Sequence, residues 1–170
     1  MTLAAQAPLA PAPDARAFRD ALGRFATGVP LVTAAPGGEP AGLLVNSLAS
    51  VSLEPPLVSF APARGSLTWQ RMRRAGRFAV NVLGLQHEPF AVRAAPPGAD
   101  RFSGLDWEPG RGGAPVLRDA LARLECEIVA EHPAGDHWIV VGRVDDRHVS
   151  ALGQPLVFFG GEFGTLQRPQ

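Results

Sequence analysis

The stretch GLLVNSLASVSLEPPLVSF, residues 42 to 60, alternates like a β-strand yet carries small polar side chains among its aliphatic ones. Successive side chains of a strand point to opposite faces, so one face here would be mostly polar and the other apolar. Three interpretations remain open: the polar groups satisfy one another inside a sheet, the polar face meets water, or its hydroxyls and backbone groups meet the polar edge of a flat heteroaromatic ligand. The polar face would hold Asn46, Leu48, Ser50 and Ser52 with Leu44, against Val45, Ala49 and Val51.

The remaining pattern predicts a mainly β fold, because most apolar runs are short, alternate, and are joined by Gly- and Pro-containing turns. Such a pattern with a few helices outside favours an antiparallel barrel with helical decoration. Pro30, in the first strand, indicates an edge position. Helices are expected over 14–25, 66–76 and 85–95, strands over 29–35, 57–61, 78–83, 121–130, 137–146 and 156–161, and a long loop anchored by Trp107 over 96–118.

The chain is 170 residues long, which favours one domain. We expect that domain over residues 15 to 170, behind a flexible Ala/Pro-rich tail at residues 1 to 14. Sixteen basic residues balance 16 acidic ones, and the absence of a basic stripe argues against a nucleic-acid partner. No apolar run reaches the roughly 18 residues of a membrane span, so a soluble, cytoplasmic protein is expected.

Missing residue types exclude several chemistries. All 16 basic residues are arginine, so the chain has neither a P-loop lysine nor a Schiff-base lysine. Cys126 is the only cysteine, which excludes intrachain disulfides and thiolate clusters, and it is expected in the core. The four histidines lack metal-site spacing, so no metal site is expected.

The stretch ARGSLTW, residues 63 to 69, combines a helix start with hydroxyls and an arginine. Ser66, Thr68 and Arg64 could therefore cradle a phosphate. The alternative is a plain helix cap beside a solvated arginine. The neighbouring cluster RMRR, residues 71 to 74, with Arg77 is most simply a solvated helix face.

The tripeptide GDH, residues 135 to 137, lies at an expected turn between two strands. An Asp–His pair at a loop tip can position a ligand or transfer a proton. The alternative is an exposed turn without a role.

These pieces occur in an order that resembles the flavin reductase family with the FMN-binding split-barrel fold. Members are the reductase components of two-component flavin monooxygenases. The resemblance covers roughly residues 16 to 166 and rests on FRDALGRFATGV, NSLASVSLEPPLVSF, RGSLTW, GRFAVNVL, RFSGLDWEPG, LECEIVAEHPAGDHWIVVGRV and PLVFFGGEF. It implies an antiparallel split β-barrel of the Greek-key type with peripheral helices.

The resemblance also implies roles for individual residues. The isoalloxazine ring would be lined by the polar stretch, the flavin phosphate would be held at the helix start, and His137 would face the ring from the nicotinamide side. Phe102 would help to close the pocket, and Asn81 would lie nearby. The ring contacts would be Asn46, Ser47, Ser50, Val51 and Ser52, and the phosphate contacts Arg64, Ser66 and Thr68.

The implied activity is hydride transfer from NADH or NADPH to FMN or FAD by a homodimer, with reduced flavin passing to a partner monooxygenase. The chain departs from the family at Leu44, where a hydroxyl residue is common, and in its C-terminal segment, where phenylalanines replace tyrosines. These departures motivate an alternative: a flavin-binding electron carrier, sensor or accessory protein without efficient NAD(P)H turnover.

Overall fold

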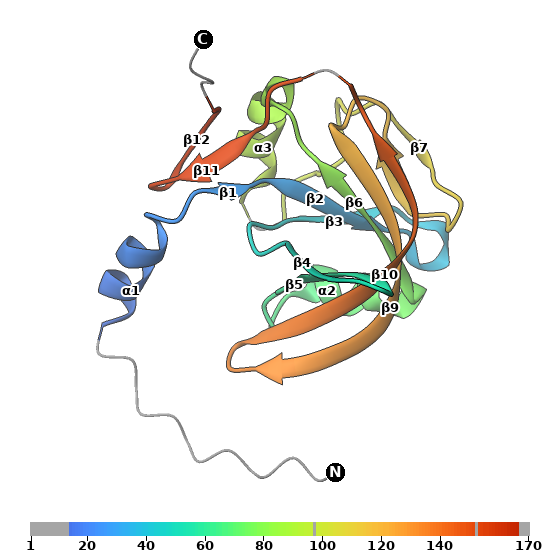
Figure 1. Ribbon diagram of the computed structural model, residues 1–170, viewed down its shortest axis with the longest axis horizontal. Helices are drawn as coiled ribbons and strands as arrows, with labels where there is room; N and C mark the ends of the chain where they lie inside the picture. Colours follow the sequence, from blue (N-terminus) through green and yellow to red (C-terminus); the bar gives the residue numbers. More distant parts are fainter. Residues whose placement is uncertain (1–13, 97, 152, 167–170) are drawn as a thin grey trace, which may run out of the picture.

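The computed structural model describes residues 14–96, 98–151 and 153–166, so the predicted tail lies outside the described residues except for Asp14. Its centre is a seven-stranded sheet in the order β3-β2-β6-β9-β10-β5-β4, accompanied by a three-stranded sheet, β1-β11-β12, and the hairpin β7-β8 (Figure 1). The strands are β1 (Thr27–Gly28), β2 (Pro30–Ala34), β3 (Ala41–Leu44), β4 (Ala49–Leu53), β5 (Pro56–Phe60), β6 (Arg77–Val82), β7 (Trp107–Pro109), β8 (Pro115–Leu117), β9 (Ala122–Ala134), β10 (His137–Val149), β11 (Val157–Phe159) and β12 (Glu162–Gly164). The helices are α1 (Ala15–Leu22), α2 (Leu67–Met72) and α3 (Glu88–Ala94), with short 3-10 turns η1 (Pro36–Gly38), η2 (Arg73–Ala75) and η3 (Leu85–His87).

Every strand pairing in the described part of the chain is antiparallel. The prediction of a mainly β, antiparallel fold with peripheral helices is therefore confirmed. No helix of the described ranges is long and apolar enough to cross a membrane.

The central sheet is strongly curved. Its two edge strands, β3 and β4, are joined by residues 45 to 48 alone, a connection that spans at most about 18 Å. In a flat seven-stranded sheet the edges would lie about 29 Å apart. The sheet must therefore roll until its edges approach, although no strand pairing closes it into a barrel within the described residues.

The main core fills the inside of this curved sheet beneath α2. Phe60 of β5 contacts Trp69 of α2 and Phe78 of β6 in edge-on arrangements, with ring centroids 5.2 Å apart in both pairs. Gly142 of β10 makes room for this cluster, because a Cβ there would overlap the Phe78 ring. Cys126 is fully buried in the same cluster, as predicted.

The second core cluster lies under α3, where Phe90 packs with Leu31, Leu83 and Leu156. Trp107 packs against this cluster, which confirms its predicted anchoring role. The loop around it is more regular than predicted, since it contains the hairpin of β7 and β8.

Two expectations about the first elements are wrong. The first helix ends at Leu22 and not near Phe25, because Gly23 follows and its N–H closes the last turn on Arg19 at 2.8 Å. Strand β2 is interior, between β3 and β6. Pro30 is tolerated there because it is the first residue of the strand, where its missing N–H leaves no gap in the ladder.

Candidate active site

The structure brings the three predicted functional stretches together at one place. The hydroxyl of Ser47 accepts a hydrogen bond from the backbone N–H of Ala61 at 2.9 Å. Strand β4 then pairs along β5, which leads directly to Ala61. The polar stretch and the chain approaching α2 are therefore fixed to one another.

The GDH turn is attached to the same segment by backbone contacts. The N–H of Trp138 donates to the carbonyl of Pro62 at 2.9 Å, and the N–H of Arg64 donates to the carbonyl of Asp136 at 2.9 Å. Between these bonds, Ala63 and His137 form an isolated antiparallel bridge. Residues 61 to 64 thus join the polar stretch on one side to the GDH turn on the other.

Strand β4 is an edge strand, since β5 is its only pairing partner in the part of the chain that the structure describes. Half of its backbone N–H and C=O groups are therefore free to meet a ligand. Asn46, Ser50 and Ser52 make no side-chain hydrogen bond to other described residues, whereas Ser47 does. The polar groups of this stretch consequently do not satisfy one another, and most of them remain available.

The simple two-face alternation predicted for this stretch is wrong in detail. Residues 45 to 48 belong to no strand, and the pairing with β5 shifts register between Ser50 and Ser52. Such a bulge leaves an extra residue, Val51, unpaired and bends the strand. Val51 is half exposed at this bend, beside the unbonded serines.

The start of α2 presents the predicted phosphate contacts. Ser66 caps the helix by accepting a hydrogen bond from the N–H of Trp69 at 3.1 Å. Thr68 lies in the first turn and is half-buried. Arg64 is exposed just before the helix, and one of its guanidinium N–H groups donates to the carbonyl of Gly135 at 3.4 Å.

His137 stands beside this helix start with its side chain 45% exposed. Its Nδ1 lies 2.7 Å from the carboxylate of Asp136, and a carboxylate can only accept, so Nδ1 carries the hydrogen. The hydrogen bond from His137, with its electrostatic attraction, holds the pKa of Asp136 below its usual value. Asp136 therefore fixes the tautomer and leaves Nε2 of His137 free for a ligand.

Phe102 lies over β3, the strand that leads into Asn46. Its ring packs edge-on against Trp107, with centroids 5.7 Å apart, and a Cβ at Gly42 would come within 3.5 Å of it. Asp100 holds the turn by accepting the N–H of Phe102 at 2.9 Å. This ring is placed to cover the approach to β3.

Asn81 is not on the surface with the others. It is fully buried, and its amide nitrogen donates to the carbonyl of Leu31, the hydroxyl of Thr33 and the carbonyl of Pro115. Its amide oxygen accepts the N–H of Leu117 at 2.7 Å. The side chain holds β8 against β2 and β6, and it has no polar atom left for a cofactor.

Two other chemically notable features belong to the scaffold. Burial, reinforced by the Asp145 carboxylate, raises the pKa of the Cys126 thiol to about 12, so it is not a thiolate nucleophile at neutral pH.

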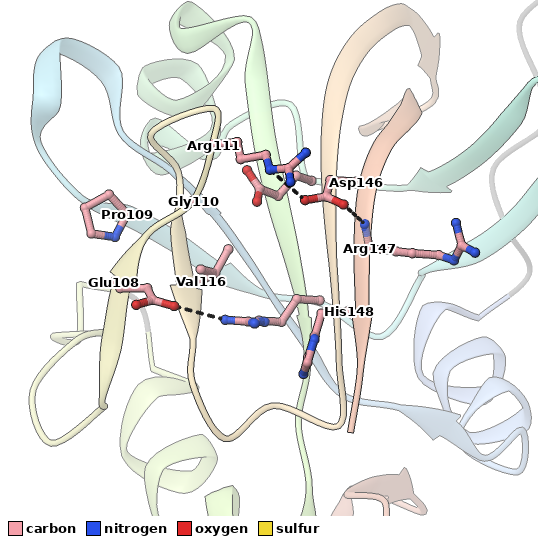
Figure 2. Close-up of a pocket in the computed structure, with 10 residues that line it drawn as sticks. Glu108, Pro109, Gly110, Arg111, Val116, Asp146, Arg147 and His148 are labelled. Atoms are coloured by element: carbon pink, nitrogen blue, oxygen red, sulfur yellow. Dashed lines mark hydrogen bonds and ion pairs between the residues drawn. The ribbon is translucent and has the colours of Figure 1, made fainter. Parts of the chain in front are cut away.

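A polar cavity of about 200 Å³ lies between the β7–β8 hairpin, the start of β9 and the end of β10. Figure 2 shows Arg111 and Asp146 on its wall, which lie 3.2 Å apart. Arg123 also lines the cavity, 3.4 Å from Glu108. None of the predicted site residues lines it.

Comparison with known families gives the identity of the chain at family level. Residues 22–167 match the family described as "Flavin reductase like domain". The chain belongs to the flavin reductase family. The prediction of an enzyme of this family, an oxidoreductase, is thereby confirmed.

Named flavin reductases resemble this one along most of its length. A flavin-dependent monooxygenase reductase subunit, HsaB, from Rhodococcus jostii is 39% identical and matches 91% of this chain and 79% of its own. The FMN reductase (NADH) SmoA from Agrobacterium fabrum is 45% identical over 91% of this chain and 88% of its own. The solved structure of the NADH:FAD oxidoreductase SgcE6 from Streptomyces globisporus, in complex with NAD and FAD fragments, superposes with a TM-score of 0.86 at 36% identity, covering 95% of this chain and 98% of its own.

Sequence reasoning missed Trp138 and the structural use of Arg73 in this flavin reductase. The guanidinium carbons of Arg64 and Arg73 lie 5.3 and 5.2 Å from the centroid of the Trp138 ring. Trp138 directly follows GDH, so an aromatic residue next to the turn was the available signal. The contact between Trp138 and Arg73 could not be predicted from the sequence, because β10 and the residues after α2 are far apart in the chain and are brought together only by the tertiary structure.

Proposed function

We propose that the protein is an NAD(P)H-dependent flavin reductase that reduces FMN or FAD and supplies reduced flavin to a partner monooxygenase. The observation that carries this proposal is the junction at residues 61 to 64, which unites the polar edge strand, the start of α2 and the Asp136–His137 pair. Family membership and the names of the relatives support it.

The side chains at this junction fit a flat polar ring with an anionic tail. The free edge of β4 and the unbonded Asn46 and Ser50 offer donors and acceptors in a line. Arg64 with the hydroxyls of Ser66 and Thr68 offers a cation and short donors suited to a phosphate. In this proposal Ser47, Val51 and Ser52 complete the ring contacts.

When bound, the flavin supplies the redox chemistry by accepting a hydride from the nicotinamide. The β4 backbone and Asn46 donate hydrogen bonds that stabilise negative charge at the polar edge of the ring. His137, oriented by Asp136, binds on the nicotinamide side, and Phe102 excludes water from the β3 side. No protein nucleophile takes part in this scheme.

The same proposal includes a homodimer of split-barrel subunits in the cytoplasm. Helix α1 lies at the outside of the fold (Figure 1), and its apolar residues Phe18 and Leu22 are 61% and 57% exposed. Phe25, just after it, is 73% exposed. A second copy of this chain would cover these apolar side chains.

The test follows nicotinamide absorbance during oxidation of NADH or NADPH, with and without added FMN or FAD. Oxidation that saturates with added flavin is expected. Reduced flavin should also pass into the filtrate on anaerobic ultrafiltration, as a reductase that supplies a second enzyme requires. Oxidation no faster than the enzyme-free control would overturn the proposal, and flavin that binds but resists reduction would favour the carrier alternative.

The departure at Leu44 does not by itself favour that alternative. Leu44 is half-buried and packs against the second core cluster. Its side chain therefore contributes to the scaffold.

A further inference from the structure

Phe102 is carried by a short turn, residues 100 to 105, which we call the cover turn. Its side chain is half-buried, and its ring packs edge-on against Trp107 with centroids 5.7 Å apart. The ring also lies close to β3, since a Cβ at Gly42 would come within 3.5 Å of it. Strand β3 leads into Asn46, so the part of the ring that remains exposed adjoins the proposed flavin site.

Asp100 fixes the backbone of the cover turn. One carboxylate oxygen, Oδ1, accepts the N–H of Phe102 at 2.9 Å and the N–H of Ser103 at 3.2 Å. An aspartate that accepts N–H groups two and three residues ahead sets the direction of the backbone between them. These two N–H groups, with a smaller contribution from the Arg93 guanidinium, hold the pKa of Asp100 below its usual value. The acceptor is therefore a carboxylate at neutral pH.

A second support comes from helix α3. The guanidinium of Arg93 donates to the carbonyl of Ser103 at 3.4 Å and to the carbonyl of Pro89 in its own helix at 3.1 Å. Arg93 thus ties the far side of the cover turn to α3. The N–H of Phe102 itself is bonded by Asp100, so the place of the ring depends most directly on that carboxylate.

We propose that Asp100 is a positioning residue for flavin binding and acts through the ring of Phe102. Its carboxylate holds the ring over β3 before the flavin arrives, so less conformational freedom is lost on binding. The inference rests on the proposed function in one respect: Phe102 meets flavin only if the flavin lies in the site proposed above.

The first experiment tests the turn without any ligand. Hydrogen exchange measured by mass spectrometry follows the amides of Phe102 and Ser103 in the flavin-free protein. Asp100→Ala should speed their exchange about tenfold, because both N–H groups lose their acceptor. Asp100→Asn keeps an acceptor oxygen and should stay within about twofold of wild type. Unchanged exchange in Asp100→Ala would overturn the proposal.

The second experiment measures the binding of FMN and FAD, in parallel, by titration calorimetry. Asp100→Ala and Phe102→Ala should each weaken the flavin that binds by about fivefold. The double variant should bind no more weakly than Phe102→Ala alone, because two residues that act through one contact do not have additive effects.

Two further variants separate positioning from charge and from general effects on the turn. Asp100→Asn should bind flavin within about twofold of wild type, since it retains the acceptor. Ser103→Ala is the matched control and should also stay within about twofold, because Ser103 is exposed in the same turn and its hydroxyl makes no hydrogen bond to described residues. Circular dichroism checks that every variant is folded.

Losses that add in the double variant, or an Asp100→Asn variant as weak as Asp100→Ala, would overturn the proposal. An active reductase whose flavin binding is unchanged in Asp100→Ala fails this inference and not the proposed function. A protein that shows the expected binding pattern but never oxidises NADH or NADPH fails the proposed function and not this inference.

Discussion

The backbone N–H of Arg64 donates a hydrogen bond of 2.9 Å to the carbonyl oxygen of Asp136. This bond joins the segment before α2 to the turn between β9 and β10. It sets a phosphate-binding candidate and an Asp–His pair side by side, although neither stretch is near the other in sequence. The proposed reductase site depends on this relationship.

His137→Ala should lower kcat/KM for NADH by about tenfold while changing the KM for flavin by less than twofold. The reason is that, in the proposed site, His137 faces the nicotinamide and turns its Nε2 to that ligand. Steady-state kinetics with each substrate varied in turn measure the split. His132→Ala is the control, since His132 is an exposed histidine on the same β9–β10 hairpin. Kinetics identical to wild type would remove His137 from the site.

Substitution of Ser66 should separate helix capping from phosphate binding. Ser66→Ala removes a cap worth about 1 kcal/mol, which corresponds to a fall in Tm of roughly 2 to 4 °C, and should raise the flavin KM about tenfold with little change in kcat. Ser66→Asp keeps the cap but repels a phosphate, so it should raise the flavin KM without lowering Tm. Thermal scans beside kinetics test this pair, and a loss confined to kcat would contradict the assigned role.

Asn81→Ala should destabilise the fold by about 3 kcal/mol, because it leaves the buried N–H of Leu117 and neighbouring polar groups unpaired. Thermal unfolding should show a Tm lower by roughly 6 to 12 °C. Below that temperature the flavin KM should stay within twofold of wild type. Asn46→Ala is expected to do the reverse, raising the flavin KM without changing Tm. A large KM effect of Asn81→Ala in folded protein would restore it as a cofactor contact.

Stability should fall in acid partly through Asp145. Hydrogen bonds from Arg77 and Arg143 hold the pKa of Asp145 below its ordinary value. The unfolded chain then binds a proton more readily, so the stabilisation is present above about pH 4 and is lost as pH falls through the lowered pKa. Wild type and Asp145→Asn should therefore differ in Tm at about pH 6, and the difference should shrink as the pH falls below the ordinary pKa of an aspartate. A Tm difference that does not change with pH would contradict this origin.

Replacing the exposed rings of the first helix and of the segment just after it should dissociate the proposed homodimer. Phe18→Ser with Phe25→Ser removes apolar surface that a second copy would bury, so the mass measured by light scattering should halve. Val149→Ser, which removes an exposed aliphatic residue 68% accessible at the end of β10, is the control. A wild-type protein that is already monomeric would end the dimer proposal.

The local elements were largely predictable because their signals are local. Asp14 and Ser66 cap helices through their own side chains. The second helix ends at Met72, earlier than predicted, and Gly76 ends the 3-10 turn η2 that follows it in the left-handed conformation, with φ 67°. Alternation and turn residues predicted the strands. The predictions are wrong where contacts with residues distant in the sequence determine the local structure. The bulge at Val51 is one such case, because the pairing of β4 with β5 creates it.

The sequence by itself therefore determined the antiparallel β class, the helix starts capped by Asp14 and Ser66, and the exclusion of lysine and disulfide chemistry. Only the tertiary structure decided which polar groups are available: it gave every polar side-chain atom of Asn81 a buried partner, and it left the side chains of Asn46 and Ser50 without one among the described residues. It also decided that Arg64 and Arg73 meet on Trp138. The physical reason is that capping and alternation act between neighbours in the chain, whereas burial and pairing depend on how distant strands and helices pack.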